Sequence, residues 1–139
     1  MTILDTNVIS ELMRPTPEPL VLQWFNRLSA DDAHLTSITV AEILLGIELL
    51  PLGKRRDLMR AGAERTLGVF AGQVLSFDEK AAHAFSLVSS TRRRHERIMS
   101  DFDAQIAAIA VAESRRHRIK QLGNSFAGHQ VSACPTSCR

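Results

Sequence analysis

The chain has 139 residues, of which 45% are hydrophobic, 23% charged and 5% aromatic, a profile typical of one compact domain. Seventeen basic and fifteen acidic side chains leave a formal charge of +2, which is too balanced for a histone-like arm. Fourteen of the bases are arginines, whose planar guanidinium can form two parallel hydrogen bonds with a phosphate or a carboxylate. The composition is therefore compatible with a nucleic-acid or acidic partner.

The cysteines and the hydropathy pattern indicate the cellular compartment in which the protein is found. Cys134 and Cys138 both lie in the last six residues, whereas the disulfides of a secreted domain are spread through the fold. The first residues include an acid and no basic stretch of the signal-peptide kind. No uncharged run approaches the ~18 residues that a membrane-spanning helix needs. We expect a cytoplasmic protein that does not contact a membrane.

Short strands and amphipathic helices alternate in the first third of the chain. Residues 2–4 form a β-prone run that ends in a polar cluster, and apolar residues over 8–13 then recur at helical spacing. Three prolines between 15 and 19 make a stiff connector, because proline lacks the amide and fixes φ. Residues 20–28 carry the apolar stripe of a second helix.

The same alternation continues to residue 113. The pattern predicts a strand at 34–38, a helix from 39 to about 50, a helix over 54–67, a short strand within 69–77, a long helix from 78 and a helix over 100–113. This order favours a parallel sheet covered by helices, in a single α/β domain spanning 1–139. Reactive groups in such sheets gather beyond the carboxyl ends of the strands.

Three acids stand where a strand ends or a helix begins, namely Asp5, Glu42 and Asp103. Each also has a purely structural interpretation. Glu42 and Asp103 follow a Thr or a Ser by three residues, which is the spacing of a capping box. Asp5 fits as an acceptor for the amides of the turn that follows it. Taken singly, Glu42 and Asp103 are better explained as capping residues.

Taken together, the three acids favour a metal site. Two carboxylates about 4 Å apart repel by about 4 kcal/mol at an effective dielectric of about 20, so a fold does not gather three of them for stability. A hard cation such as Mg²⁺ or Mn²⁺ removes the repulsion, because these ions prefer oxygen ligands. The chemistry implied is attack of a metal-activated water on a phosphodiester. That the acids converge is an inference from the fold class.

Three segments of the chain resemble motifs of a known family. Residues 1–12 (MTILDTNVISEL), 35–46 (LTSITVAEILLG) and 102–110 (FDAQIAAIA) match, in order and spacing, those of PIN-domain ribonucleases. The similarity is to the VapC toxins of type II toxin–antitoxin systems, in the FitB-like branch, and it extends over residues 1–113. It implies a PIN-like α/β/α sandwich with a central parallel sheet and a Mg²⁺- or Mn²⁺-dependent endoribonuclease site.

The resemblance also implies roles for particular residues. The family's three acids fall on Asp5, Glu42 and Asp103, which are then both the metal ligands and the catalytic residues. Thr6 and Asn7 match polar positions beside the first acid, and we expect them to orient Asp5 or a metal-bound water.

The sequence departs from the family pattern after about residue 120, where we expect a divergent, irregular tail. The family's fourth ligand position falls between 122 and 125, where Asn124 offers a neutral oxygen, and no acid occurs after Glu113. This departure supports an alternative hypothesis, a catalytically silent PIN-fold binding module that docks an antitoxin as an assembly or regulatory subunit. A DNA-directed flap-type nuclease, which uses similar acid chemistry, is a third hypothesis.

Two basic runs flank the 100–113 helix. Such runs are usually solvated helix faces, but their position fits a footprint on an RNA backbone. The candidate RNA-binding residues are Arg92, Arg93, Arg94, Arg97, Arg115 and Arg116. The resemblance therefore implies a toxin that cleaves structured RNA through metal-activated water, with these arginines on the RNA backbone.

The resemblance implies partners as well. These are a cognate VapB-like antitoxin and a second copy of the chain in a homodimer, with operator DNA bound only through the antitoxin. An apolar set near residues 43–52 is rich for a small domain and fits contact with an antitoxin or a second subunit.

Overall fold

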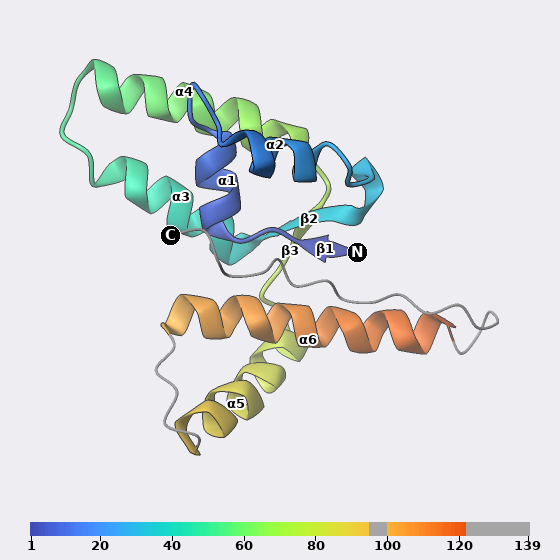
Figure 1. Cartoon of the computed structure of the whole chain (residues 1–139). Coiled ribbons are helices and arrows are strands. Elements are labelled where there is room, and N and C mark those ends of the chain that lie inside the picture. Colours follow the sequence, from blue (N-terminus) through green and yellow to red (C-terminus); the bar gives the residue numbers. More distant parts are fainter. Residues whose placement is uncertain (95–99, 122–139) are drawn as a thin grey trace. The chain divides into compact units, whose positions relative to one another are not determined.

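The structure is a computed structural model that describes residues 1–94 and 100–121 (Figure 1). It divides into two units, residues 1–74 and 75–139. Within the part of the chain that the structure describes, no helix combines the length and the apolar character required to span a bilayer.

The first unit begins with a strand and two short helices and ends with a helical hairpin. Its elements are β1 (Thr2–Ile3), α1 (Thr6–Leu12), α2 (Pro19–Phe25), a 3₁₀ turn (Ala30–Asp32), β2 (Ala33–Thr36), α3 (Ser37–Glu48) and α4 (Lys54–Val69). β3 (Val74–Leu75) follows at the boundary between the units. The predicted alternation of strands and helices is confirmed.

Among the described residues, the sheet has three strands in the order β1-β2-β3. β1 and β2 are parallel, with Thr2 opposite Ala33 and Ile3 opposite His34. On the other side of β2, the amide of Leu35 donates to the carbonyl of Gln73 at 3.0 Å. The α/β class with a parallel sheet is confirmed, and the carboxyl ends of β1 and β2 lead directly into α1 and α3.

The core of the first unit is built from the sheet and the inward faces of its helices. On α3 the buried positions are Thr39, Ile43 and Ile47, which are spaced by four residues as a helix face requires. The buried cluster consists of Leu4, Ile9, Ala33, Leu35, Ile43, Ile47, Ala63 and Phe70. This packing holds α1 and α3 in contact at the ends of β1 and β2.

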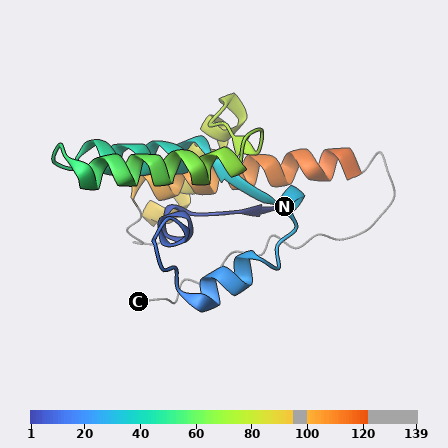
Figure 2. The same ribbon diagram turned by 90° about the horizontal axis from the view of Figure 1, so that it is seen from above.

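Figures 1 and 2 show α3 and α4 running side by side as a hairpin. The carboxylate of Glu48, at the end of α3, accepts hydrogen bonds from the guanidinium groups of Arg56 and Arg60 on α4. The hydrogen bond from Arg60, supported by the charge of Arg56, lowers the pKa of the Glu48 carboxyl below its ordinary value. Glu48 and Arg60 are exposed and Arg56 is partly buried. Ion pairs this close to solvent contribute little to folding, but they neutralise the charge on this flank of the hairpin.

The boundary between β2 and α3 differs from the prediction, which had a strand at 34–38 and a helix from Thr39. β2 ends at Thr36, and α3 begins at Ser37. The hydroxyl of Thr36 accepts a hydrogen bond from the amide of Thr39 at 3.0 Å, so Thr36 is the N-cap. Because this cap satisfies an amide of the first helical turn, the helix starts earlier than its apolar pattern suggests.

The second unit contains α5 (Glu79–Arg94) and α6 (Asp101–Gln121), which pack against each other. Buried positions on both helices are mostly alanines, whose small side chains let two helices approach closely. α6 runs beyond the predicted end at residue 113. The stretch after Glu113 loses its apolar stripe, but it is rich in arginine and lysine, which have high helix propensity.

Candidate active site

Asp5 follows β1 and is the N-cap of α1. Its Oδ1 accepts a hydrogen bond from the amide of Val8 at 2.9 Å, and the side chain is partly buried. The turn contact expected from the sequence is thus present. It occupies one carboxylate oxygen, so the second oxygen is not used by the cap.

Glu42 does not form the predicted capping box with Thr39. The cap of α3 is Thr36, which places Glu42 in the second turn of the helix. Its Oε2 instead accepts a hydrogen bond from the hydroxyl of Thr6, the first residue of α1. The capping interpretation of Glu42 is therefore wrong, and a tertiary contact between α1 and α3 holds this carboxylate.

Thr6 connects two of the three candidate acids, Asp5 and Glu42. It follows Asp5 directly in the chain, and its hydroxyl donates to Glu42. The group supplies two carboxylates and a hydroxyl, all partly buried. An all-oxygen donor set of this kind suits a hard divalent cation, so the residues present fit Mg²⁺ or Mn²⁺. Asn7 lies next to them in α1 and is exposed.

Asp103 lies in the second unit, in the first turn of α6. Its amide donates to the hydroxyl of Ser100 at 3.1 Å, and that hydroxyl donates to Oδ2 of Asp103 at 2.7 Å. Ser100 thus caps the amide of Asp103 as the capping box requires, while the Asp103 carboxylate contacts the hydroxyl of Ser100 and not its amide. Over the described ranges, 1–94 and 100–121, no three His, Cys, Asp or Glu side chains gather as a metal site. The three-acid site stays a prediction.

The structure describes only some of the predicted RNA-binding arginines. Arg92, Arg93 and Arg94 form the last turn of α5, where the negative end of the helix dipole favours cations. Arg115 and Arg116 lie on α6. Arg97 and Asn124 fall outside the described residues, as does the tail predicted after about residue 120.

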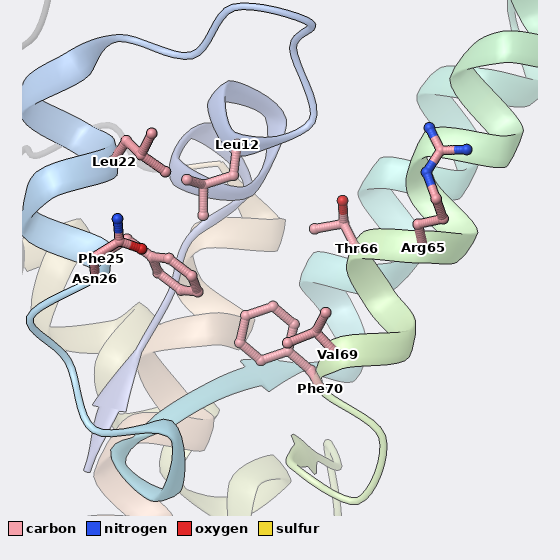
Figure 3. A pocket seen from close by; sticks show the side chains of 8 residues that line it. All are labelled: Leu12, Leu22, Phe25, Asn26, Arg65, Thr66, Val69 and Phe70. Atoms are coloured by element: carbon pink, nitrogen blue, oxygen red, sulfur yellow. The ribbon is translucent and has the colours of Figure 1, made fainter.

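An apolar cleft of about 290 Å³ opens between α1, α2 and α4 (Figure 3). Leu12 and Phe25 lie on one side of it and Phe70 on the other, with Phe25 and Phe70 ring centroids 6.2 Å apart. The lining residues are Leu12, Leu22, Phe25, Asn26, Arg65, Thr66, Val69 and Phe70. This cleft was not predicted from the sequence. The available signal was Leu22, an apolar residue off the main stripe of its helix.

Acids lie where strands lead into helices, and a hydrogen bond between α1 and α3 joins Glu42 to Thr6, the residue after Asp5. These features define a class of protein. The chain belongs to the PIN domain family, whose model matches residues 2–122. Within that family it belongs to the VapC/FitB group of toxin–antitoxin proteins.

The similar proteins cover most of the chain. Toxin FitB of Neisseria gonorrhoeae is 38% identical over 128 residues, which span 91% of this chain and 92% of that protein. Plasmid stability protein StbB of Pseudomonas syringae pv. tomato is 42% identical over 113 residues, 81% of each chain. VapC ribonuclease Y4jK of Sinorhizobium fredii is 37% identical over 113 residues, also 81% of each.

Solved structures agree with these relationships. The crystal structure of FitAcB from Neisseria gonorrhoeae matches with a TM-score of 0.74 and 40% identity, over 82% of this chain and 83% of that chain. The structure of FitAB bound to an IR36 DNA fragment matches with a TM-score of 0.72 and 40% identity, over 82% and 80%. The PIN fold expected from the sequence motifs is confirmed.

Proposed function

We propose that this chain is the toxin of a VapBC-type toxin–antitoxin pair and acts as a divalent-metal-dependent endoribonuclease on structured RNA. The observation that carries the proposal is the hydrogen bond from Thr6 to Glu42, because it anchors one partly buried carboxylate on the residue that follows Asp5 in the chain. The similarity to a protein named VapC ribonuclease supports the same activity.

Asp5, Glu42 and Asp103 would hold the ion. Mg²⁺ or Mn²⁺ supplies Lewis-acid chemistry when bound, lowering the pKa of water and offsetting charge that develops on the phosphodiester. Thr6 fixes the orientation of the Glu42 carboxylate through its hydroxyl. The α1 cap uses Oδ1 of Asp5 and holds that side chain at the end of β1, with Oδ2 left for the ion.

Arginines of the second unit would hold the RNA backbone. Arg93 and Arg94 are exposed at the end of α5, and arginine is well suited to phosphate. Binding that neutralises phosphates weakens steeply as salt rises, so RNA binding through these residues depends on ionic strength.

Cleavage should require both RNA and a divalent ion. The full chain is incubated with a structured RNA and with DNA of the same sequence, in Mn²⁺, in Mg²⁺ and with EDTA. We expect RNA cleavage with either ion, a loss of at least about 10²-fold on chelation, and slower cleavage of DNA. No cleavage under any condition would favour the silent binding module, and preferential cleavage of DNA would favour the flap-type nuclease.

Thr6→Val is expected to raise the Mn²⁺ concentration needed for half-maximal cleavage by about tenfold, because groups that orient metal ligands typically contribute 10- to 100-fold in affinity or activity. Thr6→Ser, which keeps the hydroxyl, should restore the wild-type value. Thr16→Val is a matched control, since Thr16 is exposed in the connector between α1 and α2. An unchanged Mn²⁺ requirement in Thr6→Val would contradict the proposal that Thr6 orients the Glu42 carboxylate.

The antitoxin partner has a candidate docking place in the first unit. The cleft between α1, α2 and α4 is apolar, and Leu22 and Val69 expose 39% and 69% of their surface there. Arg65 lies at the same cleft and adds a cation. We propose that an apolar segment of a VapB-like antitoxin, with an acid to pair with Arg65, docks in this cleft. The solved FitAcB and FitAB assemblies, at 40% identity, support such a partner, and operator DNA would be bound through it.

A further inference from the structure

The carboxylate of Glu11, near the end of α1, joins this helix to the start of α2. Its Oε1 accepts a hydrogen bond from the amide of Glu18 at 2.9 Å, and its Oε2 pairs with the guanidinium of Arg14 at 3.0 Å. Glu18 is the N-cap of α2, and its own side chain makes no capping hydrogen bond. Glu11 therefore bridges the two helices at the point where α2 begins. We call Glu11, Arg14 and Glu18 the α1–α2 clasp.

An acid at position 11 is unfavourable for α1 itself. Glu11 is the last residue but one of this helix, where the negative end of the helix dipole disfavours an anion. Its side chain is nevertheless only 19% exposed, against 67% for Arg14. The contact with the start of α2, and not the stability of α1, therefore accounts for an acid at this position.

α2 is held by little buried surface. None of its residues is buried, whereas α1 contains Ile9, which is fully buried. Trp24 and Phe25 of α2 are partly buried against the core of the first unit. The connector before it has prolines at 15, 17 and 19, which have no amide to donate. Since local opening costs least where few apolar groups are buried, α2 can move with little loss of burial.

α2 also forms one wall of the apolar cleft. Leu22 and Phe25 lie on this wall, and Thr66 and Val69 of α4 lie on the opposite wall (Figure 3). The width of the cleft therefore depends on the position of α2. Glu11 does not line the cleft, but it ties the start of this wall to α1.

We infer that α2 is a movable wall of the cleft and that Glu11 is the positioning residue that holds it in the conformation a partner binds. The inference rests on the docking of an antitoxin proposed above, and it names the element of this chain that adapts to that partner. A wall already held in the bound conformation lowers the ordering cost of association. Loss of the clasp should therefore weaken binding without removing any group that lines the cleft.

The test is amide hydrogen exchange of the full chain in the wild type, Glu11→Ala and Glu11→Gln. Alanine removes both contacts of the carboxylate and favours α1, so this variant should fold. We expect the amides of Glu18 and α2 to exchange about fivefold faster or more, as for loss of one hydrogen bond. Glutamine keeps an oxygen that can accept from the Glu18 amide, so exchange in Glu11→Gln should stay close to that of the wild type.

Trp24 gives a second measurement of the position of α2, because it is the only tryptophan of the chain and lies on this helix. Its fluorescence should be quenched more strongly by acrylamide in Glu11→Ala than in the wild type. Glu64→Ala is the matched control, since Glu64 is an exposed acid on α4 that does not line the cleft. It should leave both the exchange of α2 and the quenching of Trp24 unchanged.

Binding of the VapB-like antitoxin, measured by calorimetry, should be about fivefold weaker in Glu11→Ala and unchanged in Glu64→Ala. Unchanged exchange and quenching in Glu11→Ala, or an equal effect in Glu64→Ala or Glu11→Gln, would overturn the inference. Faster exchange with an unchanged affinity would contradict the role of the clasp in binding. A wild type that does not bind the antitoxin would instead refute the docking proposal, while the exchange result would separately show whether the clasp holds α2.

Discussion

Asp5→Asn should abolish RNA cleavage while the protein stays folded. A metal ion contributes several kcal/mol of transition-state stabilisation, and each 1.36 kcal/mol is tenfold in rate, so we expect kcat/KM to fall by about 10²–10³-fold. Asparagine caps helices as well as aspartate does, so it can still accept the hydrogen bond from Val8 that Asp5 accepts now. The change therefore removes the negative charge and keeps the cap.

The measurement combines cleavage of a structured RNA with thermal unfolding and Mn²⁺ titration by calorimetry. Asp57→Asn is the matched control, because Asp57 is an exposed acid in the first turn of α4, away from the Thr6–Glu42 contact. It should cleave RNA as the wild type does. Undiminished cleavage by a folded Asp5→Asn variant would contradict the assignment of Asp5 as a metal ligand.

Val69→Lys should weaken binding of the cognate VapB-like antitoxin by about 30-fold or more, the size of effect seen when a central interface contact is lost. Val69 is exposed at the end of α4 and lines the apolar cleft. In the free protein a lysine there remains in water, whereas an apolar partner in the cleft would have to desolvate its ammonium group. The substitution therefore lowers the stability of the complex and not that of the free folded protein.

Isothermal calorimetry with the cognate VapB-like antitoxin measures the effect. Leu58→Lys is the control for charge, since Leu58 is 71% exposed on α4 and does not line the cleft. The affinity of the Leu58→Lys variant for the antitoxin should match that of the wild type. Equal affinities for Val69→Lys and the wild type would place the antitoxin elsewhere on the surface.

Local patterns in the sequence predicted where helices start, because helix starts and caps depend on residues that are neighbours in the chain. The step from a β-prone run to an acid and then to helical spacing locates Asp5 at the start of α1. Ser100 likewise accepts the hydrogen bond from the amide of Asp103 that their spacing predicts. In both places the partners lie within one turn of the chain, so no distant segment competes for them.

The error at Glu42 has a physical cause. Thr36 and Thr39 are both competent helix caps, three residues apart, and the local sequence does not distinguish between them. The structure caps α3 with Thr36, and both threonines are buried and joined by a hydrogen bond between their hydroxyls. This choice moves Glu42 from the helix start to a position where it can contact Thr6.

The sequence by itself determined the order of the elements, the parallel sheet and the family, because periodicity and motif spacing are properties of the chain alone. Only the tertiary structure decided that Thr6 donates to Glu42 and that an apolar cleft opens between α1, α2 and α4. Each of these depends on how a helix is rotated when it packs on segments distant in the chain, and that rotation is set by burial of the core and not by local propensity.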